Sequence, residues 1–134
     1  MTRARILTLA GIVAACGAFA ALEASNRGPK AGDTAPQFEA RDQHGQMVRL
    51  AAFRGQSTVV LYFYPKDGTP GCTAQACSIR DGYHAIQAAG AVVIGVSADT
   101  AHSHEEFARK HNLPFPILPD PEHTSSGNMA WACL

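Results

Sequence analysis

One stretch of the chain constrains its fold more than any other: residues 59–81, which read VVLYFYPKDGTPGCTAQACSIRD. Six apolar and aromatic residues end at Pro65, a short polar turn follows, and Cys72 comes where a helix is expected to begin. Proline is favoured in the first helical turn and threonine at the position before it, so Thr69 and Pro70 mark that start. The stretch predicts a strand that delivers a cysteine to a helix N-terminus.

The rest of the chain alternates between strand and helix patterns. The apolar run at 57–64 has no polar face, which predicts a central strand buried on both sides. Alternation of strands and helices builds an α/β layer with parallel strands. The expected elements are strands 37–41 and 47–50 as a hairpin-like pair, a helical turn at 51–55, strand 57–64, helix 70–89, strand 91–97, helix 101–111 and strand 115–118.

Size and charge limit the function classes. The chain has 134 residues, of which 46% are hydrophobic, as in one ordinary globular domain. Its 11 basic residues balance its 11 acidic residues, and no basic stripe is visible. A nucleic-acid partner is therefore not expected.

The first 22 residues differ in composition from those that follow. Two arginines precede an uncharged apolar run at 6–22, which predicts a signal peptide or an N-terminal membrane anchor over 1–22. The run is shorter than the roughly 20 residues of a spanning helix, so cleavage is favoured. Residues 13–16 also resemble a bacterial lipobox, which leaves a lipoprotein at Cys16 as an alternative. We expect export to the bacterial periplasm or cell envelope, with membrane contact only through this segment.

Three further segments follow the N-terminal one. Residues 23–36 are small and polar and read as a linker that ends in a turn. Residues 37–120 carry the strand and helix patterns and form the expected domain. Residues 121–134 lack the periodicity of either element and read as an anomalous tail.

The two cysteines within the opening stretch differ in setting. A thiol in the first turn of a helix feels the positive end of the helix dipole, which favours the nucleophilic thiolate. Cys72 has Thr, Pro and Gly as neighbours, which favours a nucleophile over an inert core cysteine. Cys77 lies about 8–9 Å away on an ideal helix, whereas a disulfide needs a Cα separation of about 4.4–6.8 Å. The pair therefore predicts a redox cycle that requires the helix to unwind.

These residues resemble a known family. The run at 65–72, PKDGTPGC, matches the peroxiredoxin pattern P-x-x-x-T-x-x-C, and Cys77 matches the resolving cysteine of the bacterioferritin-comigratory-protein (PrxQ) subfamily. The resemblance spans about 32–120 and implies a thioredoxin-like fold of the peroxiredoxin type. Further similar segments are GDTAPQF at 32–38, CSIRD at 77–81 and VIGVS at 93–97.

The resemblance implies a thiol peroxidase. Cys72 would attack a hydroperoxide and become a sulfenic acid, while Thr69 would hold the thiolate and peroxide and Pro65 would shield the thiolate from water. Cys77 would then form a disulfide with Cys72, which a thioredoxin-like dithiol would reduce. No metal, flavin or haem is implied.

The carboxyl end departs from the family pattern. After Asp120 the family continues with a helix, a strand hairpin and a final helix, which this sequence does not show, so a frameshifted or truncated product is the favoured explanation. The family's active-site arginine comes from that part, and Arg80 and Arg109 do not match its position. We therefore expect reduced activity, and exposed apolar surface on the strands at 59–64 and 92–96.

Other interpretations remain open. A thioredoxin-like disulfide oxidoreductase is an alternative, although it ordinarily shows C-x-x-C, and an inactive remnant is another. The remaining histidines and the last cysteine are expected to have no catalytic or metal-binding role. His102 and His104 are assigned to solvated surface, His84 and His111 to amphipathic helix positions, and Cys133 to the tail; zinc at Cys72, Cys77 and His84 is disfavoured by the spacing and the absent fourth ligand.

Overall fold

The structure, a computed structural model, describes residues 29–122. Its elements are β1 (Glu39–Arg41), β2 (Met47–Arg49), the 3-10 helix η2 (Leu50–Phe53), β3 (Thr58–Phe63), α2 (Pro70–Asp81), α3 (Tyr83–Ala88), β4 (Ala91–Ser97), α4 (Ala101–His111) and β5 (Ile117–Pro119). The predicted alternation of strands and helices is confirmed, and the predicted bounds of β4 and α4 are those observed.

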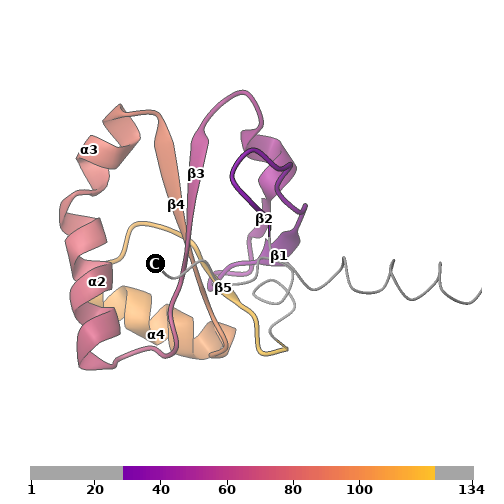
Figure 1. The fold of residues 1–134 in the computed structure, drawn as a ribbon. Coiled ribbons are helices and arrows are strands. Elements are labelled where there is room, and N and C mark those ends of the chain that lie inside the picture. Colours follow the sequence, from indigo (N-terminus) through magenta and orange to yellow (C-terminus); the bar gives the residue numbers. More distant parts are fainter. Residues whose placement is uncertain (1–28, 123–134) are drawn as a thin grey trace, which may run out of the picture.

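The sheet lies between two unlike layers (Figure 1). Strands β3, β4 and β5 run parallel in that order, and β1 and β2 form a separate antiparallel pair. On one face, Val93 of β4 packs in a cluster with residues of α2 and α4; on the other, the adjacent Ile94 packs with the hairpin and η2. Burial of both faces explains why β4 is apolar along its length.

The prediction that residues 57–64 form the central strand is wrong for the described residues. There β4 is the middle strand, and β3 pairs with β4 alone. An apolar run reports burial on both faces but not the order of strands in a sheet, which explains the error. Val60 of β3 is 43% exposed, as expected for that strand. The expected exposure of 92–96 is wrong, because side chains of β4 pack into the core on both faces of the sheet.

The single helix predicted over 70–89 is two helices. The chain turns at Gly82, where φ is −89° and ψ is 0°, between α2 and α3. Glycine has the lowest helix propensity after proline, so a bend there loses little helical stability. Beyond the bend, Tyr83 and Ile86 pack against the core cluster that contains Val93 and residues of α2 and α4, here called the helix-side core cluster.

The turn between β1 and β2 is hydrogen-bonded to β5 and to the segment that precedes it. The buried side chain of Gln43 donates to the carbonyl of Phe115 at 3.3 Å and accepts from the amide of Ile117 at 2.7 Å. Asp42 Oδ1 accepts from the amide of His44 at 2.9 Å, which closes the turn. These bonds hold the β1–β2 hairpin against β5, although the hairpin and β5 belong to different sheets.

Within residues 29–122 the structure contains no helix that is both long and apolar enough to cross a membrane. The segment predicted as a signal peptide or anchor at 1–22, the lipobox cysteine Cys16 and the tail beyond Glu122 lie outside the described residues.

Candidate active site

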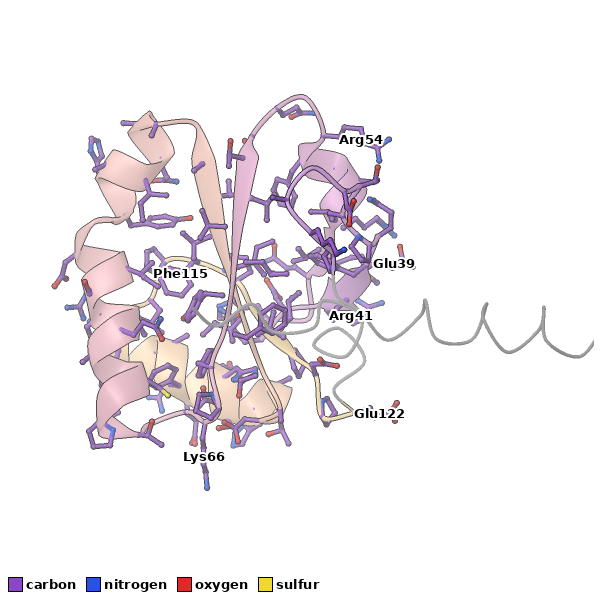
Figure 2. All side chains as sticks on the ribbon, viewed as in Figure 1. Glu39, Arg41, Arg54, Lys66, Phe115 and Glu122 are labelled. Atoms are coloured by element: carbon purple, nitrogen blue, oxygen red, sulfur yellow. The ribbon has the colours of Figure 1, made fainter. Side chains whose placement is uncertain are left out.

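The loop from Tyr64 to Thr69 leads from β3 into α2 and positions Cys72. Tyr64 is 3% exposed, and its amide donates to the carbonyl of Val96 at 3.1 Å, extending the β3–β4 ladder. Figure 2 shows Lys66 reaching away from this loop, consistent with its exposed side chain. The chain reverses at Gly68, whose φ of +72° is strained for any residue with a Cβ atom.

Cys72 lies in the first turn of α2 and is 9% exposed. Its thiol is free and belongs to the helix-side core cluster with Tyr64 and Ala76. The first amides of a helix lack intrahelical acceptors and carry the positive end of the dipole, so they stabilise negative charge at this position. The arrangement provides a nearly buried sulfur with a favourable environment for a thiolate.

Thr69 and Pro65 lie where the sequence predicts, but with different contacts. Thr69 occupies the cap position and Pro70 begins α2, as predicted, although among the described residues the Thr69 side chain makes no capping hydrogen bond. Its hydroxyl instead donates to the carbonyl of Lys66 at 3.4 Å, within the turn that precedes the helix. Pro65 is exposed, on the solvent side of the loop.

Cys77 lies five residues further along α2, in a half-buried position. Its thiol is also free, so the helix is intact between two reduced cysteines. The sulfur lies 3.9 Å from Nδ1 of His111, the last residue of α4. The second cysteine therefore contacts the end of α4 through its sulfur.

A carboxylate that sequence reasoning missed organises the loop. Asp67 accepts hydrogen bonds from the hydroxyl of Tyr64 at 2.6 Å and from the hydroxyl of Ser103 at 2.7 Å. Its second oxygen also lies 2.7 Å from Nδ1 of His104, and its amide donates to Asp99 at 2.6 Å. The side chain of Asp67 thus joins the Cys72 loop to the N-terminal half of α4, and its backbone amide joins the loop to the segment that follows β4.

The assignment of His104 to the solvated surface is wrong, because its side chain is completely buried. Its Nε2 has no hydrogen-bond partner among residues 29–122, while Nδ1 faces Asp67. The spacing of His104, Phe107, Ala108 and His111 is i, i+3, i+4, i+7, which marks the buried face of α4 and was visible in the sequence. His102 is exposed, as predicted.

Hydrogen bonding sets the charge states in this network. Burial alone would raise the pKa of Asp67, but hydrogen bonds from His104, Tyr64 and Ser103 outweigh it and hold that pKa below its ordinary value. Burial and the bond to Asp67 raise the pKa of Tyr64, and burial with the nearby charges of Asp67 and Cys72 raises that of Tyr62. The loop therefore contains a carboxylate anion held by neutral phenol and hydroxyl groups.

The two arginines on these helices lie away from Cys72. Arg80 Nη1 donates to the carbonyl of His111 at 2.7 Å, and its Nη2 pairs with Asp81 at 2.8 Å. Arg109 is exposed on α4. Arg80 therefore lies beside the second cysteine, at the contact between α2 and α4.

The fold and this site together define the class of protein. A parallel sheet with helices on one face, and a free thiol in the first turn of the helix that follows β3, is the thioredoxin-like fold of the peroxiredoxin type. Peroxidoxin BcpB from Mycobacterium tuberculosis shares it with a TM-score of 0.71 and 36% identity, over 75% of this chain and 65% of that one.

The chain belongs to the AhpC/TSA family, whose model matches residues 31–131. Peroxiredoxin Q, chloroplastic, from rice (Oryza sativa subsp. japonica) is 55% identical over 89 residues, covering 66% of this chain and 41% of that protein. Peroxiredoxin Bcp from Bacillus subtilis is 49% identical over 92 residues, covering 69% and 58%. The chain thus spans about half the length of the curated relatives that it matches.

The predicted location is wrong. Relatives from rice and Sedum lineare, 55% and 52% identical, are chloroplastic proteins, which favours a plastid over the bacterial periplasm or cell envelope. A signal peptide at 1–22 is not shown by these comparisons, and arginines ahead of an apolar run do not by themselves identify the compartment.

Proposed function

We propose that this chain is a thiol-dependent peroxidase that reduces hydrogen peroxide and organic hydroperoxides. The observation that carries the proposal is the placement of Cys72 in the first turn of α2, nearly buried and free, with a second free cysteine on the same helix. Relatives that are named peroxiredoxin and are 55% and 49% identical in sequence support the proposal. We assign the catalytic unit to residues 37–120.

The first step is oxidation of Cys72. Its thiolate attacks one oxygen of the hydroperoxide, so that an S–O bond forms as the O–O bond breaks. The other oxygen leaves with a proton as water or an alcohol, and Cys72 becomes a sulfenic acid. We assign Thr69 to hold the thiolate and peroxide through its hydroxyl, which a small rotation frees from its long bond to the Lys66 carbonyl. We assign Pro65 to limit the access of water from the exposed side of the loop.

The second step is resolution by Cys77. Its sulfur attacks the sulfenic sulfur of Cys72, an S–S bond forms, and water leaves. Because α2 is intact around both thiols, the first turns of the helix must unwind before the sulfurs meet. A thioredoxin-like dithiol then reduces the disulfide by exchange. In this scheme the atoms of the protein that are oxidised and reduced are the sulfurs of Cys72 and Cys77.

The test is a thiol titration before and after one equivalent of hydrogen peroxide, followed by peptide mass spectrometry. Rapid loss of two thiols with a bond between Cys72 and Cys77 is the expected result. Cys77→Ser should leave Cys72 as a sulfenic acid that reacts with dimedone. Thiol loss only with disulfide substrates would indicate a disulfide oxidoreductase instead, and no loss with either oxidant would indicate an inactive protein.

A further inference from the structure

The imidazole of His111 contacts the sulfur of Cys77. Nδ1 lies 3.9 Å from Sγ, within the range of a hydrogen bond to sulfur. The ring packs edge-on against Phe107, with centroids 5.1 Å apart and planes at 63°, which fixes the direction in which Nδ1 points. A histidine that the sequence assigned to a helix face without a role thus lies against one of the two redox cysteines.

Arg80 of α2 helps to hold His111 beside Cys77. Its guanidinium donates to the backbone carbonyl of His111 at 2.7 Å, which holds the end of α4 beside the turn that contains Cys77. The pKa of Arg80 is raised, chiefly by its hydrogen bond to Asp81 and further by the charge of Cys77 and a hydrogen bond to it. A cation beside a thiol favours the thiolate, as does a neighbouring imidazole that accepts its proton.

We propose that His111 is the proton acceptor for Cys77 in the resolution step, with Arg80 as the residue that positions the pair; this rests on the peroxidase function proposed above. His111 is a catalytic residue in this scheme because it touches the reacting thiol. Its Nδ1 must carry a lone pair, so the proton of the neutral ring is on Nε2. Imidazole is suited to the task because it exchanges protons between about pH 5 and pH 8.

The proton has a route to solvent. Beyond the ring, an open hollow of about 200 Å³ is lined by Asp67, Gly68, Ser103, Glu106, Phe107, Lys110 and His111. The charged groups that face His111 are therefore Arg80 from α2, Glu106 and Lys110 from α4, and Asp67 from the loop across the hollow. Two of these groups are basic and two are acidic, so their charges offset one another around the hollow.

The order of events follows from the geometry. Cys77 gives its proton to His111 while α2 is folded, because only then does its sulfur touch Nδ1. Unwinding then carries the thiolate to Cys72, where the S–S bond forms and the S–O bond of the sulfenic acid breaks. The leaving hydroxide takes a proton from His111 or solvent, so that one water is released and the charges balance.

The test that does not depend on peroxide uses the full chain with Cys72→Ser. The rate of Cys77 alkylation by iodoacetamide is followed by peptide mass spectrometry at about pH 6.5 and pH 9. His111→Asn should slow alkylation about tenfold at the lower pH, because the thiolate fraction falls. It should change the rate less than about twofold at pH 9, where a free cysteine is mostly deprotonated. His84→Asn, an exposed histidine on α3, is the matched control and should change neither rate.

An unchanged rate at pH 6.5 in His111→Asn overturns the proposal. So does an equal loss at both pH values, which is the mark of a merely structural effect. His111→Gln keeps more of the side-chain volume and should give the same pH-dependent loss, so the test does not depend on the folding of one variant.

A single-turnover experiment in the Cys72-containing chain completes the test. With one equivalent of hydrogen peroxide, His111→Asn should leave the rate of Cys72 oxidation within about twofold and slow disulfide formation about tenfold near pH 6.5. Disulfide formation at the wild-type rate overturns the proposal. If the wild-type Cys72 is not oxidised while the alkylation result holds, the peroxidase function fails and the proton transfer from Cys77 to His111 stands.

Discussion

The two cysteines share one helix but are held in opposite ways. The loop that leads to Cys72 is tied to β4 and α4 through Asp67, whose backbone and carboxylate make hydrogen bonds to Tyr64, Asp99, Ser103 and His104. The turn around Cys77 is held to α4 by one hydrogen bond from Arg80 and by the thiol contact with His111. Cys72 itself is 9% exposed, and Cys77 is half-buried.

This difference shows how one short segment serves two purposes. A nucleophile that meets substrate directly benefits from a fixed position, and a buried network with several bonds supplies it. A resolving thiol must travel, so its contacts have to be few and reversible. Substitutions in one region at a time test this difference, because equal responses of the two regions would contradict it.

The largest effect is expected for Cys72→Ser, which replaces the nucleophile. Peroxide consumption should fall to the background of the buffer, because a serine hydroxyl does not ionise near neutral pH. Cys77→Ser should keep the first oxidation and block the disulfide. The measurement is peroxide consumption over the first turnover. Equal loss of the first turnover in both variants would contradict separate roles for the two thiols.

Asp67→Asn should destabilise the protein by about 2–4 kcal/mol in urea unfolding, because buried donors lose a carboxylate acceptor. The side chain of Asp67 is only 7% exposed, so the expected loss of unfolding free energy is larger than for a residue in an exposed loop. Glu105→Gln, an exposed carboxylate on α4, is the control and should change stability by less than about 0.5 kcal/mol. A loss as small as that of the control would mean that the loop is not fixed by this network.

Acid should weaken the Cys72 loop through the same carboxylate. The folded-state pKa of Asp67 lies below its ordinary value of 3.8, so the unfolded chain takes up the proton first. The stabilisation is therefore complete above about pH 5 and is lost as the pH falls through the folded-state pKa. The gap in urea midpoint between wild type and Asp67→Asn should narrow from pH 5 downwards. A gap that stays constant with pH would exclude ionised Asp67 as its source.

The smallest effect separates two glycines near Cys72. Gly68→Ala should destabilise by about 1–2 kcal/mol, because φ is +72° there and alanine is strained in that region although no neighbouring atom is in the way. Gly71→Ala lies in α2, also in open space, and should stabilise by a few tenths to about 1 kcal/mol. Thermal unfolding measures both. Changes of the same sign would show that the loop turn is not held in its observed conformation.

Local patterns were enough for the elements but not for their placement. The bounds of β4 and α4 follow from the alternation of strand and helix patterns, and the structure places Thr100 and Asn112 as the caps of α4. The bend at Gly82 and the place of β3 beside β4 in the sheet of residues 29–122 depend on tertiary packing, which an apolar run does not encode. These are tertiary effects that override a local preference.

The candidate site shows the same division. Cys72, Cys77, Thr69 and Pro65 were chosen from spacing and resemblance, and their roles stay predictions. Asp67 and His104 were missed because their partnership spans 37 positions along the chain, which no short pattern reveals. The burial of His104 was predictable from the helical spacing with Phe107, but the charged neighbours of both residues obscured it.

The most direct test of a fixed loop beside a releasable helix is hydrogen exchange before and after one equivalent of hydrogen peroxide. Once a Cys72–Cys77 bond has formed, amides of α2 should lose protection, while those of β4 and α4 should keep it. Peptide mass spectrometry on the same sample identifies the bond. A Cys72–Cys77 disulfide with α2 still protected, or a loss of protection throughout residues 29–122, would contradict the account.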